Sequence, residues 1–286
     1  MKIAILIGAY KNPTYLDGLI QSLATSKTNV YVHINKYNIG EFTQLIDKYN
    51  NVDNVHVYSE YAINWGGTGL LKSQMFVLNK ALEDKENGYF HFITGQDILI
   101  KSVNELVDFS TKNSNKNFVH VIPFNYEWWM GRYMMYHLFD LINYRKNIIN
   151  KSAQVLSSRL QKLLHIKRSA LPFNKLYAGS SWWSINRSVA QLFVDFFGKE
   201  ENLKRMKYTC APDEMYYQSI LMNSPLAETN TGENLCYLKW TGEGGSPKLL
   251  DENDFQDLKN TCCFFARKVE PDKSAKLIEL IKNHIQ

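Results

Sequence analysis

The amino-acid sequence predicts an α/β fold with a mixed, mostly parallel sheet flanked by helices. Over the first hundred residues, short apolar runs alternate with segments whose apolar residues recur at helical spacing. This alternation is typical of parallel sheets, because the chain usually returns to the next parallel strand through a crossover helix. The chain has 286 residues and is 45% hydrophobic, enough for one α/β domain with a large core. We find no internal repeat, low-complexity tract or linker, so we expect a single domain over residues 1–286.

The first hundred residues contain the clearest strand and helix signals. We expect strands at residues 2–10, 29–35, 54–60 and 89–95. We expect helices at residues 13–23, opened by Asn12-Pro13, and at residues 41–50 and 68–84. Ligands of parallel sheets bind beyond the carboxyl ends of the strands. The residues expected there include Ala9, Asn35, Asn64, Trp65 and Asp97.

From about residue 112 the alternation ends. We expect further strands at residues 118–124, 182–187, 234–240 and 262–269. We expect helices at residues 188–198, closed by Gly198, and at residues 213–224 and 273–285. The aromatic and basic section over residues 126–169 is expected to be largely helical.

Charge and cysteine content exclude some classes of protein. The formal net charge is +5 and the isoelectric point is about 8.8, too small an excess to indicate nucleic-acid binding. It suits a local cationic pocket or contact with anionic lipid. The first apolar run has about six residues, far below the roughly 20 that span a bilayer, and lacks a signal-peptide cleavage pattern. The four cysteines lack metal-ligand spacing, so we expect reduced core residues of a cytoplasmic protein: Cys210, Cys236, Cys262 and Cys263.

The segment APDEMYYQSIL, residues 211–221, has two interpretations. Asp213 and Glu214 follow a proline at an expected helix start, where the helix dipole and free N–H groups favour carboxylates. That interpretation needs no function. A general base at neutral pH has to be ionised, so the same environment also suits catalysis. The motif alone leaves both interpretations open.

Three aromatic and basic segments are also open to two interpretations. Trp65 precedes Gly66-Gly67 and could face a sugar or base, or fill the core at a turn. In GSSWWSINRS, Trp182 and Trp183 point to opposite sides of a strand, so one could be core while the other lines a cleft. The C-terminal cations could be site residues or surface charges: Lys248, Arg267 and Lys268.

A metal-binding Asp-x-Asp does not follow the fourth expected strand. FITGQD supplies one carboxylate there, Asp97. Asp251 and Asp254 in DEND have suitable chemistry but follow no such strand, and we interpret them as a solvated helix start. The sequence therefore does not indicate a divalent metal site.

Seven segments in order resemble one family: AYKNP, VHINK, WGGTGLL, FITGQDILIKS, GSSWWSINR, PDEMYYQSIL and FFARKV. They resemble the core-2/I-branching N-acetylglucosaminyltransferases and peptide O-xylosyltransferases, glycosyltransferase family 14. The resemblance covers nearly the whole chain and is weakest from about Phe118 to Leu176. It implies a GT-A-like, Rossmann-like fold and an inverting, metal-independent transfer from a UDP-sugar. It also implies a nucleotide-binding half, about residues 1–111, and an acceptor-binding and catalytic half, about residues 112–286.

The resemblance implies roles for individual residues. Glu214 falls at the position of the catalytic base, and Lys268 at that of a lysine that contacts the diphosphate. Donor-binding residues are expected to be Ala9, Asn35, Asn64, Trp65, Asp97, Lys248, Arg267 and Lys268. Acceptor-binding residues are expected to be Ser181, Trp182, Trp240, Arg132 and His137. Asn35 replaces an aspartate that is frequent in the family, and Gly242 stands where an acceptor-side tyrosine is expected.

We therefore expect a bacterial glycosyltransferase that moves GlcNAc from UDP-GlcNAc to a hydroxyl of an oligosaccharide or lipid-linked surface glycan. An inverting transfer needs a base for the acceptor hydroxyl and positive charge for the leaving diphosphate; without a metal or other cofactor, lysine and arginine must supply that charge. One rival is a metal-dependent transferase that uses Asp97, or Asp251 and Asp254; another is a carbohydrate-binding protein on the same fold. Residues 151–169 are amphipathic and basic, which suits peripheral contact with an anionic membrane or an ordinary surface helix.

Overall fold

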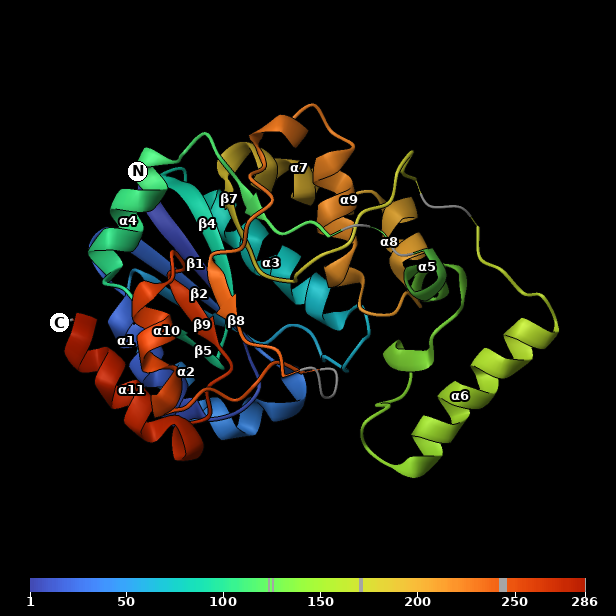
Figure 1. Cartoon of the computed structure of the whole chain (residues 1–286), viewed down its shortest axis with the longest axis horizontal. Helices are drawn as coiled ribbons and strands as arrows, with labels where there is room; N and C mark the ends of the chain where they lie inside the picture. The colour runs from blue at the N-terminus through green and yellow to red at the C-terminus, as the bar shows by residue number, and fades with distance from the viewer. Residues whose placement is uncertain (123, 125, 170–171, 242–245, 286) are drawn as a thin grey trace.

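The computed structural model describes residues 1–122, 124, 126–169, 172–241 and 246–285. The protein is organised around a central sheet (Figure 1). Its strands are β1 (Lys2–Ala9), β2 (Thr28–Ile34), β3 (Val55–Tyr58), β4 (Asn87–Thr94), β6 (Phe118–Val119) and β7 (Trp183–Asn186). Among the described residues they form one six-stranded sheet in the order β3-β2-β1-β4-β7-β6. β1 to β4 are parallel, whereas β7 is antiparallel to both β4 and β6. The predicted α/β fold with a mixed, mostly parallel sheet is confirmed.

Helices cover both faces of this sheet, as Figure 1 shows. The helices on one face are α3 (Gly69–Glu83), α7 (Arg187–Phe197) and α9 (Tyr216–Met222), with α8 (Glu200–Met206) beside α7. Those on the other face are α1 (Pro13–Leu23), α2 (Thr43–Tyr49) and α4 (Val103–Lys112). Successive side chains of a strand point to opposite faces, so Leu6 lies in the first core and Ile5 and Ile7 in the second. This explains why buried strands such as β1 are apolar throughout.

A second, smaller sheet lies beyond the end of β4. It contains β5 (Asp97–Leu99), β9 (Phe265–Arg267) and β8 (Cys236–Leu238), and it packs on α10 (Phe255–Asn260) and α11 (Pro271–Ile285). The sequence predicts the strands at β8 and β9 but not β5, which begins only three residues after β4 ends and pairs with β9, a strand distant in sequence. Cys236 and Cys263 are buried as predicted, whereas Cys262 is exposed, so the prediction of a core residue is wrong there.

The section over residues 118–169 differs most from its prediction. The expected strand at residues 118–124 pairs continuously only over Phe118–Val119, and the backbone N–H and carbonyl of Val119 bond to the side chain of Asn230. An isolated bridge follows, in which the N–H of Ile122 donates to the Ala178 carbonyl at 2.8 Å. The expected helical section is divided into α5 (Tyr126–Met134), a short 3₁₀ turn at Leu138–Asp140 and α6 (Ile148–Leu163). In the described part of the chain, no helix is long and apolar enough to cross a membrane.

Candidate active site

The segments that follow β1 and β2 meet at the carboxyl edge of the large sheet. The backbone carbonyl of Ala9 accepts from the N–H of Asn35 at 2.8 Å. The side-chain amide of Asn35 accepts from the N–H of Ile63 at 2.9 Å and donates to the Ile63 carbonyl at 3.0 Å. Asn35 therefore fixes the segment that leads into Asn64 and Trp65 against the end of β2. The structure thus brings together four of the five residues that the sequence places at this edge.

Asp97 holds two predicted site residues in position. Its buried carboxylate accepts hydrogen bonds from Trp182 Nε1 at 2.8 Å and from Arg267 Nη1 at 3.2 Å. The Arg267 guanidinium lies 3.9 Å from the centroid of the Trp182 ring, within cation–π range. Burial raises the pKa of Asp97, and the charge of Arg267 acts in the opposite direction. Asp97 is therefore a positioning residue whose oxygens already bind protein donors.

Four cations gather beside this group, and we call Lys11, Arg145, Arg267 and Lys268 the cationic cluster. Burial lowers the pKa of Lys268, and the charges of Lys11, Arg267 and Arg145 lower it further, while Glu270 raises it. Glu270 lies 2.6 Å from Lys11 Nζ and 3.9 Å from Lys268 Nζ. Glu270 pairs with Lys11 and Asp97 with Arg267, so four cations face two carboxylates, and the positive charge that remains favours the binding of an anion.

Lys248 lies in a separate ion-pair network. Its Nζ is 2.8 Å from Asp254 and 3.3 Å from Asp251, and Lys239 Nζ is 2.8 Å from Asp254. Asp254 is only 1% exposed, so its interpretation as a solvated carboxylate is wrong: it is a buried anion that two lysines neutralise. Its position at a helix start is confirmed, because Asp251 and Asp254 form a capping box there. Nowhere in the described ranges do three or more histidine, cysteine or acidic side chains gather as metal ligands.

Glu214 lies in a tight turn and not within the helix expected over residues 213–224. Pro212–Glu214 form a 3₁₀ turn, which we call the acid turn, and α9 begins only at Tyr216. The residue before the turn, Ala211, has a φ of 46°, and its N–H donates to the carbonyl of Gly66 at 2.8 Å. A left-handed conformation costs a non-glycine residue about 1–2 kcal/mol. Here it keeps the acid turn bonded to the glycine turn that follows Trp65.

The two carboxylates of the acid turn have different environments. Glu214 is 36% exposed, and its Oε2 pairs with Arg132 Nη1 at 2.5 Å. Asp213 is buried and accepts a hydrogen bond from the Ser181 hydroxyl. Burial and the negative charge of Glu214 raise the pKa of Asp213 to about 6. Glu214 is thus the carboxylate that can contact a ligand, while Asp213 is buried and bonded to Ser181.

Residues 179–182 connect the acid turn to the cationic cluster. The N–H of Gly179 donates to the Glu214 carbonyl at 2.9 Å, and Ser181 bonds to Asp213. The next residue, Trp182, bonds to Asp97 and lies under Arg267. Trp183 points the other way and is buried in the core, as expected for one of the two tryptophans. One short segment therefore links the candidate base to the candidate anion site.

The remaining predicted acceptor residues are distributed differently. Arg132 contacts Glu214 directly. Both ring nitrogens of His137 bond within the protein, Nε2 to the Gly131 carbonyl at 3.0 Å and Nδ1 to Gln154 Nε2 at 3.1 Å. His137 therefore positions α5 and α6 and has no free nitrogen for a sugar. Trp240 is 60% exposed. Gly242 lies outside the described residues.

Sequence reasoning missed Lys11, Arg145 and Gly179. Lys11 lies in the AYKNP segment directly after β1, a position from which it could have been identified. Arg145 lies 4.2 Å from the centroid of the Trp65 ring, which depends on how residues 141–147 fold back. No local pattern indicates that contact. Gly179 follows from packing: a Cβ there would lie 1.8 Å from the His120 carbonyl oxygen.

Gly179→Ala should destabilise the fold and displace the acid turn. The added methyl would meet a backbone oxygen that cannot move aside cheaply, and overpacking of this kind costs about 1–3 kcal/mol or more. Urea unfolding measures the loss. The matched control is Gly18→Ala in α1, where nothing lies within 4 Å, and which should gain up to about 1 kcal/mol. Equal effects of the two substitutions would contradict the close approach.

Asp213→Asn should make the protein more stable relative to the wild type as the pH rises. The folded-state pKa of about 6 lies above the unfolded value of 3.8, so the wild type loses stability between about pH 4 and pH 6 as a buried carboxyl ionises. The variant avoids this cost, which reaches about 3 kcal/mol for a shift of this size. Urea unfolding at pH 4.5 and pH 7.5 measures the difference, with the exposed Asp108→Asn as control. A difference that stays constant with pH would show that Asp213 ionises freely.

Comparisons with known proteins identify the family of this chain. A family model described as Core-2/I-Branching enzyme matches residues 3–260. Xylosyltransferase 2 of Rattus norvegicus is 22% identical over 94% of this chain and 32% of its own length. Xylosyltransferase 1 of Rattus norvegicus and a xylosyltransferase of Ciona intestinalis are each 24% identical over 89% of this chain, covering 32% and 30% of their lengths. The chain thus spans about a third of the length of the curated relatives it matches.

A solved structure was also matched. The 4-diphosphocytidyl-2C-methyl-D-erythritol synthase of Anaerococcus prevotii covers 70% of this chain and 77% of its own, with 8% identity and a TM-score of 0.32. A likeness this weak carries no argument. The family model, by contrast, matches nearly the whole chain, from the first strand to the end of α10. The chain therefore belongs to the Core-2/I-Branching enzyme family.

Proposed function

We propose that this protein is an inverting glycosyltransferase that moves a sugar from a UDP-sugar to an acceptor hydroxyl. The observation that carries the proposal is the link through residues 179–182, which ties Glu214 to Arg267 by way of Ser181 and Trp182. A base and an anion site on one rigid segment are the two groups that such a transfer needs.

In the proposed reaction Glu214 accepts the proton of the acceptor hydroxyl. The acceptor oxygen attacks the anomeric carbon of the donor from the face opposite the leaving group and forms the new C–O bond. The bond from that carbon to the diphosphate breaks, and its electron pair stays on the diphosphate oxygen. The cationic cluster stabilises the charge that develops there. Glu214 then returns its proton to solvent.

The ion pairs of the acidic residues favour a metal-independent mechanism. Asp97 is bonded to Arg267 and Trp182, and Asp254 to Lys239 and Lys248. A metal-dependent transferase would have to break these pairs to free its ligands. Lys268 and Arg267, with Lys11, are the cations that we assign to the diphosphate. Lys248 is already shared between two aspartates and would contribute only if it left them.

For the donor we propose UDP-GlcNAc first. The relatives that are 22% and 24% identical over the aligned region are named xylosyltransferases, which favours UDP-xylose as a second candidate. For the acceptor we propose a hydroxyl of a bacterial surface glycan, either a free oligosaccharide or a lipid-linked one. Trp65, which is 45% exposed, and Trp240 offer apolar rings on which a sugar can lie.

A panel of nucleotide sugars tests this function. Purified protein is incubated with UDP-GlcNAc, UDP-xylose, UDP-glucose and the corresponding GDP-sugars, with and without EDTA, and donor hydrolysis and thermal unfolding are followed. We expect one UDP-sugar to raise the unfolding temperature and to be hydrolysed slowly in the presence of EDTA. Loss of activity in EDTA would favour the metal-dependent rival. Stabilisation by glycans, with no turnover of any donor, would favour a carbohydrate-binding protein.

A further inference from the structure

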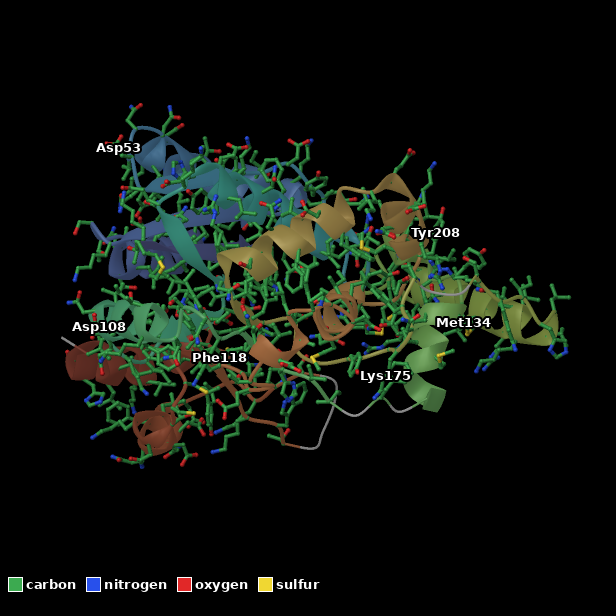
Figure 2. The ribbon with its side chains drawn as sticks, turned by 90° about the horizontal axis from the view of Figure 1, so that it is seen from above. Asp53, Asp108, Phe118, Met134, Lys175 and Tyr208 are labelled. Atoms are coloured by element: carbon green, nitrogen blue, oxygen red, sulfur yellow. The ribbon has the colours of Figure 1, made fainter. Side chains whose placement is uncertain are left out.

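Helix α6 turns polar side chains toward the protein and apolar side chains outward, which is the reverse of a helix that packs on a hydrophobic core. In Figure 1 it lies at the outer edge of the molecule beyond α5, and in Figure 2 it again lies at the extreme edge, on the side of the labelled Met134 and Tyr208. A surface helix of a globular protein normally turns its apolar stripe inward. In α6 the buried side chains are Gln154 and Gln161.

The inward face of α6 is held by hydrogen bonds from these two glutamines. Gln154 Oε1 accepts from the N–H of Leu138 at 2.8 Å. Gln161 bonds to both backbone groups of Tyr136, accepting from its N–H at 2.7 Å and donating to its carbonyl at 2.8 Å. These bonds replace missing backbone partners at the end of α5, so they fix the helix in a defined orientation. The apolar residues of α6 are not needed to hold it.

The outward face of α6 is aliphatic. Ile149, Leu156, Leu160 and Leu163 lie at helical spacings of seven, four and three residues, which places them on one side. Ile149 and Leu163 are each 73% exposed and Leu156 is 58% exposed. Ile148, Val155 and Leu164 extend the same exposed surface. We call this surface the α6 face.

Positive charge surrounds the α6 face. Residues 141–169 contain no aspartate or glutamate. Their exposed cations are Arg145, Lys146, Lys151, Arg159, Lys162 and Lys167. An aliphatic stripe flanked by lysine and arginine complements a layer of anionic headgroups above acyl chains. Sixteen residues of helix measure about 24 Å along the surface, enough for a helix that lies on a bilayer.

We propose that the α6 face docks this protein on an anionic lipid surface. The inference goes beyond the transfer reaction, because binding to lipid requires neither donor nor acceptor. A second copy of the chain fits the face less well, since two α6 helices would bring their like charges together. A bilayer, in contrast, needs no matching shape and supplies negative charge along the whole helix.

Helix α6 is also connected to the donor side of the candidate site. Arg145, three residues before α6, lies against the Trp65 ring, and Trp65 stacks on Tyr144 with centroids 5.9 Å apart. Arg145 also contributes to the charge that lowers the pKa of Lys268. A lipid-bound α6 therefore holds one edge of the candidate site at a fixed height above the membrane. That arrangement suits an acceptor carried on a lipid.

Vesicle flotation without any sugar tests the proposal. We expect the protein to float with phosphatidylcholine vesicles that contain phosphatidylglycerol and to remain unbound with pure phosphatidylcholine. Leu156→Gln with Leu160→Gln, and separately Lys151→Glu with Lys162→Glu, should each weaken partition by about tenfold or more. The matched controls are Ile39→Gln with Leu280→Gln, and Lys85→Glu with Lys112→Glu, which change exposed side chains of the same kinds elsewhere and should float as the wild type does.

Two further measurements separate a loss of lipid binding from a loss of folding and from dimer formation. Since the α6 face is exposed, the Leu156→Gln and Leu160→Gln pair should leave the unfolding temperature unchanged, which separates lost docking from lost folding. Sedimentation velocity should show a monomer. The proposal is overturned if the wild type does not bind anionic vesicles, or if the variant with Leu156→Gln and Leu160→Gln loses a dimer instead of lipid binding. A protein that floats but turns over no donor would leave docking supported and the proposed transfer refuted.

Discussion

Glu214→Gln should lower turnover by about 10²–10⁴-fold, the range that a positioned general base contributes. The amide keeps the shape of the side chain and can still accept a hydrogen bond from Arg132, but it cannot take the acceptor proton. Glu214 is partly exposed at the end of the acid turn, so the substitution buries no new polar group. UDP binding, measured by calorimetry or thermal shift, should stay close to that of the wild type because the diphosphate contacts lie on the cationic cluster.

The control for this variant is Glu228→Gln, an exposed glutamate in the short 3₁₀ turn after α9. It should retain wild-type turnover and stability. If Glu214→Gln and Glu228→Gln had the same turnover, the ion pair with Arg132 would be purely structural, and the interpretation of Glu214 as a helix-start charge would be the right one. A loss of UDP binding together with turnover would instead mean that the acid turn supports the donor site.

Local patterns predict the first half of the fold because its information is local. β1, β2 and β4 are largely buried on both faces, and the helices between the strands carry regular apolar spacing, as Leu16, Leu19, Ile20 and Leu23 in α1 do. The second half is less predictable because its strands are short, and its strands β8 and β9 pair with each other and with β5 from the first half. The helix expected at residue 213 begins later because Ala211 is bonded to Gly66, a residue nearly 150 positions away.

The candidate site is likewise only partly predictable from the sequence. The resemblance to the family makes Glu214, Arg267, Lys268 and Trp182 candidates, and the structure places Trp182 between the acid turn and the cationic cluster. What the sequence does not reveal is which groups are already satisfied. Asp97 and His137 have suitable chemistry, yet their polar atoms are engaged within the protein, those of Asp97 by Trp182 and Arg267 among others and those of His137 by Gly131 and Gln154. Such competition is a property of the folded chain and has no local signature.

Lys268→Met should lower kcat by about 10²–10³-fold, the cost of removing one donor from a charge-stabilising site. The reason is the charge balance of the cationic cluster. In the free protein the Lys268 ammonium is partly buried and repelled by Lys11, Arg267 and Arg145, so its pKa is lowered. A bound diphosphate would reverse that balance, because its negative charge would attract Lys268 and the cations that surround it. The variant should therefore bind UDP more weakly and gain less thermal stability from it.

The same charge balance separates a functional cluster from a structural ion pair. Lys268 lies 3.9 Å from Glu270, too far for a strong pair, so its removal relieves repulsion and loses little attraction. The unligated Lys268→Met protein should unfold at the same temperature as the wild type or above it, even as turnover falls. Proteins commonly accept such local instability where function requires it. Lys273→Met, an exposed lysine two residues into α11, is the control and should change neither quantity. If Lys268→Met instead destabilised the free protein and left UDP binding intact, Lys268 would serve the fold, and the leaving group would need another source of charge.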